Sequence, residues 1–124
     1  MLGSHKIISF VGARDPERAK GFYQGTLGLR LVEEQLPFAL VFDANGTMLR
    51  VSIVQEVTAA KYTVLGWQVP DIAATVRDLE KAGVKLERYG IPGQDELGIW
   101  TAPGGTRVAW FKDPDGNLLS VTQF

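Results

Sequence analysis

Side chains that usually perform covalent chemistry are nearly absent from this chain. It contains no cysteine and a single histidine, His5, close to the first residue. Disulfides, thiolate metal sites and a cysteine nucleophile are therefore excluded. No nucleophile can be paired with a base either, because His5 is expected to lie at a frayed terminus. The sequence accordingly predicts no catalytic residue and no cofactor.

Arg50 is the side chain with the sharpest potential for ligand binding. Strand alternation over 47–54 places it on one face with Met48, and that face is expected to look into an apolar cleft. A guanidinium group there needs an anion, because an unpaired buried charge is costly. Its planar fork suits a carboxylate or a phosphate of a ligand. Alternatively, Arg50 pairs with an internal acid such as Glu33 or Glu34, or reaches solvent along its stem.

Aromatic and small polar residues complete the predicted lining. Trp100 and Trp110 offer large faces that bind planar or cationic ligands, although tryptophan in a small core is equally ordinary. Trp67 alternates differently and is expected to pack against a helix. An apolar lining with sparse polar groups is typical of small-molecule pockets. The predicted ligand-binding residues are Phe10, Met48, Arg50, Gln68, Trp100, Trp110 and Ser120.

These residues are carried by a sequence that repeats itself. Residues 11–19 align with 67–75 when Asp15 is set on Asp71, and 43–51 align with 113–121. The second half is the longer one, because extra residues separate its helix from its final turn. Two copies of an open sheet can enclose a binding cleft, so the repeat itself indicates a site built from both halves.

Each half is expected to fold as a βαβββ module within a single domain, 1–124. Module one covers 6–56 and module two covers 62–124. Asp15, followed by Pro16 at the first helical position, and Asp71 are expected helix N-caps. The fold class is α+β, an open, cup-shaped and mostly antiparallel sheet. Strands are predicted at 6–11, 29–35, 38–43, 47–54, 63–69, 84–89, 107–112 and 118–124, and a glycine-rich loop at 90–105 forms either a lid or surface decoration.

Composition narrows the possible partners. Hydrophobic residues make up 45% of the 124 residues, charged residues 22%, and the formal net charge is −1. This balance provides no basic surface for nucleic acid, and no apolar run approaches the roughly 20 residues that span a bilayer. We therefore expect neither nucleic acid nor a membrane as a partner, and a cytoplasmic location.

Two motifs resemble the signatures of the vicinal oxygen chelate superfamily. Residues 15–23 with 27–29 (DPERAKGFY and LGL) are similar to its first-module signature, and 111–118 (FKDPDGNL) to its closing signature. The superfamily includes glyoxalase I, bleomycin-resistance proteins, fosfomycin-resistance enzymes and extradiol dioxygenases. Its members usually dimerise, so the resemblance implies a homodimer, which would also cover exposed sheet edges.

The resemblance also identifies where a metal would be held. Metal-dependent members typically place a histidine on the first strand of each module and a carboxylate on the last strand. The matching positions here are Ile8, Val64, Arg50 and Ser120. Isoleucine and valine donate nothing, serine is a poor ligand and arginine repels a cation. We expect no metal at these positions; a site made from carboxylates elsewhere is the alternative.

Two classes of function remain. The leading one is a metal-free small-molecule-binding protein of the glyoxalase/bleomycin-resistance type, which sequesters an aromatic or anionic organic ligand in a cleft between the modules. The alternative is a glyoxalase-like lyase or isomerase, a thiol transferase or a dioxygenase with a non-standard site. Binding is favoured because the superfamily's enzymes commonly stabilise an oxyanion through a metal, whose ligands are missing here.

Overall fold

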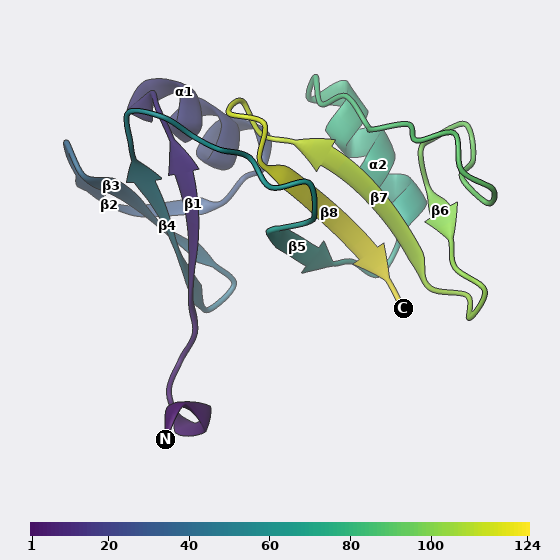
Figure 1. The fold of residues 1–124 in the computed structure, drawn as a ribbon, viewed down its shortest axis with the longest axis horizontal. Helices are drawn as coiled ribbons and strands as arrows, with labels where there is room; N and C mark the ends of the chain where they lie inside the picture. The colour runs from purple at the N-terminus through teal and green to yellow at the C-terminus, as the bar shows by residue number, and fades with distance from the viewer. The chain divides into compact units, whose positions relative to one another are not determined.

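The computed structural model describes residues 1–124, which form two compact units, Met1–Thr58 and Ala59–Phe124. Each unit contains one open four-stranded sheet with a helix on one face (Figure 1). The α+β class and the two modules predicted from the sequence are confirmed. No helix in either unit has the length and apolar character needed to cross a membrane.

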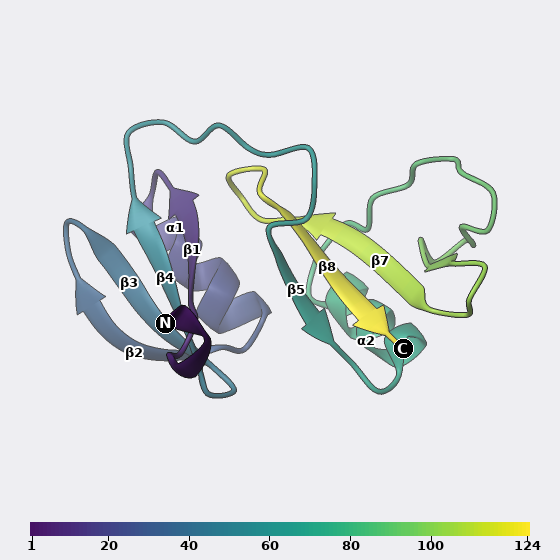
Figure 2. The ribbon, with the colours of Figure 1, turned by 60° about the horizontal axis from the view of Figure 1, so that its bottom comes forward.

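The first unit follows the predicted βαβββ order. After a short 3-10 turn at Leu2–Ser4, its elements are β1 (Ile8–Ala13), α1 (Pro16–Lys20), a π-helical turn (Gly21–Thr26), β2 (Arg30–Gln35), β3 (Ala39–Ala44) and β4 (Thr47–Ile53). The strand order is β1-β4-β3-β2, as Figure 2 shows. β1 and β4 are parallel, and the other two pairs are antiparallel.

The helix cap and strand alternation set the two faces of this first sheet. Asp15 Oδ1 accepts hydrogen bonds from the backbone N–H groups of Glu17 and Arg18, which confirms the predicted N-cap. Leu49 and Val51 on β4 are fully buried, and by alternation they point to the face opposite Met48 and Arg50. On the opposite face Phe10 is 59% exposed and Met48 41%. The predicted division of β4 into a core face and an open face is therefore correct.

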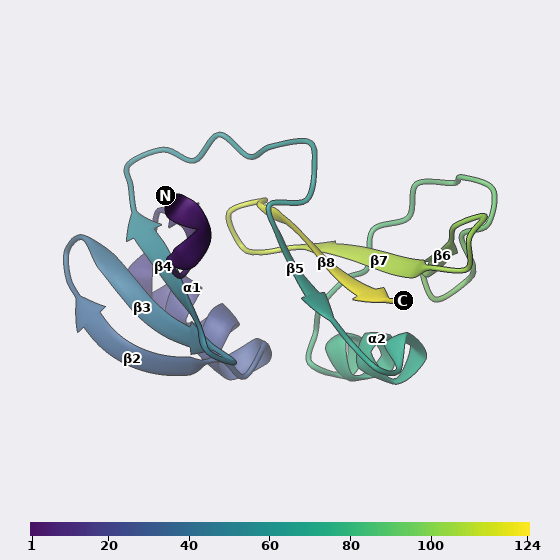
Figure 3. The same ribbon diagram turned by 90° about the horizontal axis from the view of Figure 1, so that it is seen from below.

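The second unit has the same order with shorter strands. It comprises β5 (Leu65–Gln68), α2 (Ile72–Lys81), β6 (Trp100–Thr101), β7 (Arg107–Lys112) and β8 (Leu118–Gln123), with strand order β5-β8-β7-β6. Asp71 accepts a hydrogen bond from the Ala74 N–H and caps α2, as predicted. Figure 3 shows α2 covering one face of this sheet. On that side Trp67 stacks on Phe111, with ring centroids 6.4 Å apart, so Trp67 belongs to the core face.

One predicted strand is wrong. The segment 84–89 forms only an isolated bridge between Leu86 and Phe111, and the edge strand is β6, inside the segment predicted as a loop. Both segments lie along the same edge of β7, because Leu86 is opposite Phe111 and Trp100 is opposite Val108. Val84 and Leu86 are buried, in line with the apolar alternation of this segment, but alternation does not show that a second segment shares that edge.

Candidate functional site

On the open face of the first sheet, Arg50 lies between Phe10 and Val41 in register. Its Nη2 donates a hydrogen bond to Gln35 Oε1 at 2.9 Å, and Gln35 Nε2 donates to Glu33 Oε2 at 3.0 Å. Glu34 instead pairs with Lys20 at 3.3 Å. The direct partner of Arg50 is therefore an amide, which links it to the Glu33 carboxylate.

A β-bulge places Gln35 and Glu33 on the same face of the sheet as Arg50 and turns Glu34 to the other face. The pairing of β2 with β3 shifts between Leu31 and Glu33, so these two residues oppose neighbouring positions of β3 and point to opposite faces. Beyond the bulge Gln35 pairs with Ala39, which in turn pairs with Ser52 on β4. Sequence reasoning missed Gln35, because it considered only internal acids such as Glu33 and Glu34 as protein partners of Arg50.

On the open face of the second sheet, three aromatic rings lie together. The ring centroid of Trp110 is 5.5 Å from that of Tyr89, in an edge-on arrangement, and 6.1 Å from that of Trp100. Tyr89 is 46% exposed and both tryptophans are half-buried. We call these three residues the aromatic cluster. Trp100 and Trp110 were predicted from the sequence, whereas Tyr89 was not.

Hydrogen bonds hold the segments that carry these rings. Trp100 Nε1 donates to the Pro92 carbonyl at 3.1 Å. Gln94 Oε1 accepts from the Tyr89 backbone N–H, and Gln94 Nε2 donates to the carbonyls of Glu87 and Gly98. The glutamine side chain therefore links the segment before the 90–105 stretch to the segment that leads into β6. This stretch positions Trp100 through its own hydrogen bonds.

Ser120 and Gln68 also belong to the second unit. Ser120 pairs with Gly66 on one side and Trp110 on the other, but it is only 6% exposed. A Cβ atom at Gly66 would come within 2.9 Å of Ser120 Oγ, so the glycine makes room for the hydroxyl. Gln68 pairs with Thr122 and is exposed. Ser120 therefore offers a ligand little surface, and Gln68 offers more.

A pocket of about 280 Å³ lies beside the aromatic cluster. It is lined by Ala59, Ala60, Lys61, Tyr89, Lys112, Gly116 and Leu118. Lys112 also forms an ion pair with Glu87 at 3.3 Å. Burial raises the pKa of Tyr89 above 10.0, Glu87 raises it further, and Lys112 opposes the increase. Lys112 shares the open face with Trp110 by simple alternation, but no sequence signal identified Lys61.

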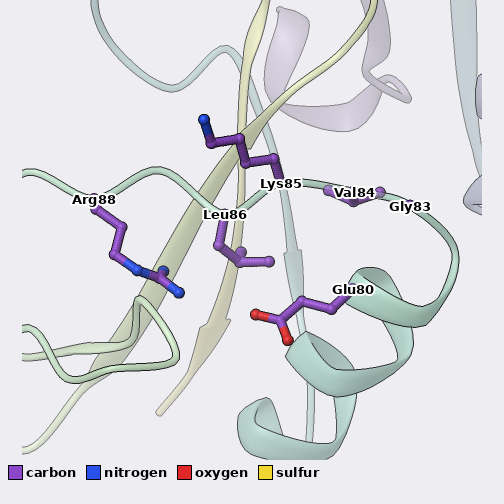
Figure 4. A pocket seen from close by; sticks show the side chains of 6 residues that line it. All are labelled: Glu80, Gly83, Val84, Lys85, Leu86 and Arg88. Carbon is purple, nitrogen blue, oxygen red and sulfur yellow. The ribbon is translucent and has the colours of Figure 1, made fainter.

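Two other pockets lie within single units and differ in chemistry. One, of about 380 Å³, follows α2 and is lined by Glu80, Gly83, Val84, Lys85, Leu86 and Arg88. In Figure 4 the charged ends of Glu80 and Arg88 point toward one another, whereas the Lys85 side chain extends away from both. The other, of about 700 Å³, is lined by Arg14, Asp15, Arg18, Pro37, Ile53, Val54 and Gln55, beside the start of α1.

The residues at the positions implied for a metal do not fit one. Ile8 and Val64 present hydrocarbon, and the Arg50 guanidinium is positively charged and bound to Gln35. Ser120 supplies one hydroxyl, a weak ligand for transition metals. No group of three or more His, Cys, Asp or Glu side chains elsewhere in the chain could share a metal ion. We therefore assign no chemical step to a metal.

A family model decides the classification. The model for the glyoxalase/bleomycin resistance protein/dioxygenase superfamily matches residues 7–121. The chain belongs to this superfamily. The match extends over both units, so each βαβββ unit is a module of the superfamily fold. Comparison with curated proteins found no match.

Solved structures of the superfamily share the fold. A glyoxalase family protein from Enterococcus faecalis has a TM-score of 0.78 at 19% identity, covering 98% of this chain and 99% of its own. A lactoylglutathione lyase from Agrobacterium tumefaciens has a TM-score of 0.75 at 19% identity, covering 97% and 93%. A superfamily member from Sphaerobacter thermophilus has a TM-score of 0.72 at 22% identity, covering 97% and 98%. At these identities the likeness concerns the fold alone, since one fold serves many functions.

Proposed function

We propose that this superfamily member binds and sequesters a small organic molecule without the help of a metal, and that the aromatic cluster is its main contact surface. The observation that carries the proposal is the position of Trp110, which contacts both Tyr89 and Trp100 on the open face of its sheet. Three partly exposed rings from three separate segments form a surface that suits a flat apolar ligand.

The rings are held in place by the protein itself. Gln94 and the Pro92 carbonyl hold the segments that carry Tyr89 and Trp100. Trp110 lies on β7, which pairs with β6 on one side and with β8 on the other. A ligand that covers them therefore loses little affinity to the ordering of side chains. In the first unit the exposed Phe10 and Met48 and the half-buried Arg50 share one face of the sheet, and they stay candidate contacts.

Tryptophan fluorescence tests the proposal with a control already present in the chain. In a Trp67→Phe variant the remaining emission comes from Trp100 and Trp110. Titration with 4-nitrobenzamide, a neutral flat probe, is expected to quench this emission with saturation. In a Trp100→Phe/Trp110→Phe variant only Trp67 emits, and its quenching should stay weak and unsaturable. Equal quenching in the two variants, or no saturable component, would contradict the proposal.

The enzyme alternative is tested by metal content. A lyase or dioxygenase of this superfamily that acts through a metal needs imidazole or carboxylate ligands, and the four implied positions have none. Elemental analysis of purified protein is expected to find no stoichiometric zinc, iron, nickel or manganese. A retained metal at a molar ratio of one would favour the enzyme alternative.

A further inference from the structure

We propose that the ligand is an organic anion whose acidic group enters the pocket between Lys61 and Lys112 while its flat body covers Trp110. This inference rests on the proposed function and adds the chemical class of the ligand. Neither lysine was among the residues predicted from the sequence. Ligands of this class carry a carboxylate, sulfonate or phosphate attached to an aromatic or similarly flat apolar group.

The charges around the pocket favour an anion. Two of its lining residues, Lys61 and Lys112, carry positive charges, and none carries a negative one. Glu87 lies outside the lining and offsets part of the Lys112 charge through its ion pair. The nearby Asp113 carboxylate accepts bonds from Asp115 N–H, Asn117 N–H and Asn117 Nδ2 within its own turn. The Lys61 charge is therefore the one best placed to act on a bound anion.

The rest of the lining gives the pocket an apolar wall and one neutral donor. Leu118 and two alanines provide hydrocarbon, which raises the strength of a charged hydrogen bond by excluding water. The Tyr89 hydroxyl can donate to the same acidic group, because a phenol keeps its proton at neutral pH. A pocket of about 280 Å³ accommodates an acidic group and part of a ring.

The pocket and the aromatic cluster form one continuous surface. Tyr89 belongs to both, because it lines the pocket and its ring contacts Trp110. Lys112 and Trp110 are two residues apart on β7 and point to the same open face, opposite Leu118 and Ser120 of β8. A molecule that places its acidic group beside the lysines therefore places an attached ring over Trp110.

The experiment compares two probes of nearly identical shape. Isothermal titration calorimetry of the intact protein is expected to show that 4-nitrobenzoate binds more tightly than 4-nitrobenzamide, and that added salt weakens only the benzoate. Lys61→Gln should weaken 4-nitrobenzoate roughly three- to tenfold, as for loss of a partly screened ion pair, and leave the amide unchanged. Lys81→Gln, an equal change of charge on α2, is the matched control and should affect neither probe. Acetate, which has the charge without the ring, should bind much more weakly.

The possible failures are distinguishable. If both probes bind equally and Lys61→Gln has no effect, the aromatic surface stands and the anion pocket is overturned. The same conclusion follows if Lys61→Gln and Lys81→Gln weaken the benzoate equally, because only net charge would then matter. If neither probe binds, the proposed function fails, and this inference fails with it. If acetate binds as tightly as 4-nitrobenzoate, the aromatic cluster does not take part.

Discussion

Arg50 and Gln35 form the polar contact that most changes the interpretation of the first unit. The sequence-based hypothesis gives Arg50 a ligand anion or an internal acid as its partner. The structure gives it an amide that is itself bonded to Glu33, so one of the five N–H donors of the guanidinium is taken by Gln35.

Replacing Arg50 by methionine distinguishes a structural role, through its bond to Gln35, from a role in ligand binding. We expect Arg50→Met to lower the free energy of unfolding by about 1 kcal/mol, because Gln35 loses its half-buried donor. If Arg50 binds the ligand, affinity for an anion should fall by about 1.5–3 kcal/mol, the range for a hydrogen bond to a charged group. If Lys61 and Lys112 hold the anion instead, its affinity should not change. Urea denaturation and calorimetry with 4-nitrobenzoate measure the two effects. Unchanged stability with lost affinity would show that the Gln35 contact is incidental.

Tyr89 provides a pH-dependent signal within the proposed site. Its pKa is raised above 10.0 in the folded state, first by burial and then by Glu87. The folded protein therefore retains this proton longer than the unfolded chain. The associated stability is present below pH 10.0 and is lost as the pH rises through the folded-state pKa. Compared with Tyr89→Phe, the parent protein should show an extra phenolate absorbance step with its midpoint above 10.0. Glu87→Gln should lower that midpoint, whereas Lys112→Gln should raise it.

At the scale of elements, the second sheet depends on a close approach between β5 and β8. Gly66 pairs with Ser120, and a methyl group at Gly66 would come within 2.9 Å of Ser120 Oγ and 3.4 Å of its carbonyl oxygen. The absence of a side chain at Gly66 on β5 thus leaves room for the buried hydroxyl of Ser120 on β8, and Ser120 in turn pairs with Trp110.

We expect Gly66→Ala to destabilise the protein by about 1–3 kcal/mol, the usual cost of overpacking. Adding Ser120→Ala should restore part of this loss, because it removes the nearest clashing atom. Thermal unfolding of both single variants and the double variant measures the coupling. Strictly additive effects would mean that the backbone contact, rather than the hydroxyl, sets the cost.

At the scale of the molecule, sheet edges indicate self-association. β1 and β5 are edge strands in their sheets, and exposed strand edges are normally covered. Together with the resemblance, this leads us to expect a homodimer. Light scattering after size exclusion should give twice the 13.6 kDa mass of the chain. A mass of 13.6 kDa at micromolar concentration would contradict the expectation.

Local signals in the sequence determined most of the fold. Asp15 and Asp71 marked both helix starts, because an N-cap needs only its own side chain and the next few backbone N–H groups. The internal repeat and strand alternation determined the two modules and the division of β4 into two faces. The absence of cysteine and of histidine beyond His5 limited the possible chemistry, because composition alone decides which reactive groups a chain possesses.

Tertiary structure decided which residues meet. The edge of β7 is shared by Leu86 and β6, and a bulge in β2 gives Arg50 the partner Gln35. Lys61, Tyr89 and Lys112 come from separate segments, of which only Lys112 lies in a strand, and the fold of the second unit brings them to one pocket. Alternation along a strand predicts the face of the sheet to which each of its side chains points. It carries no information on which distant segment lies opposite, because pairing depends on the packing of the whole unit.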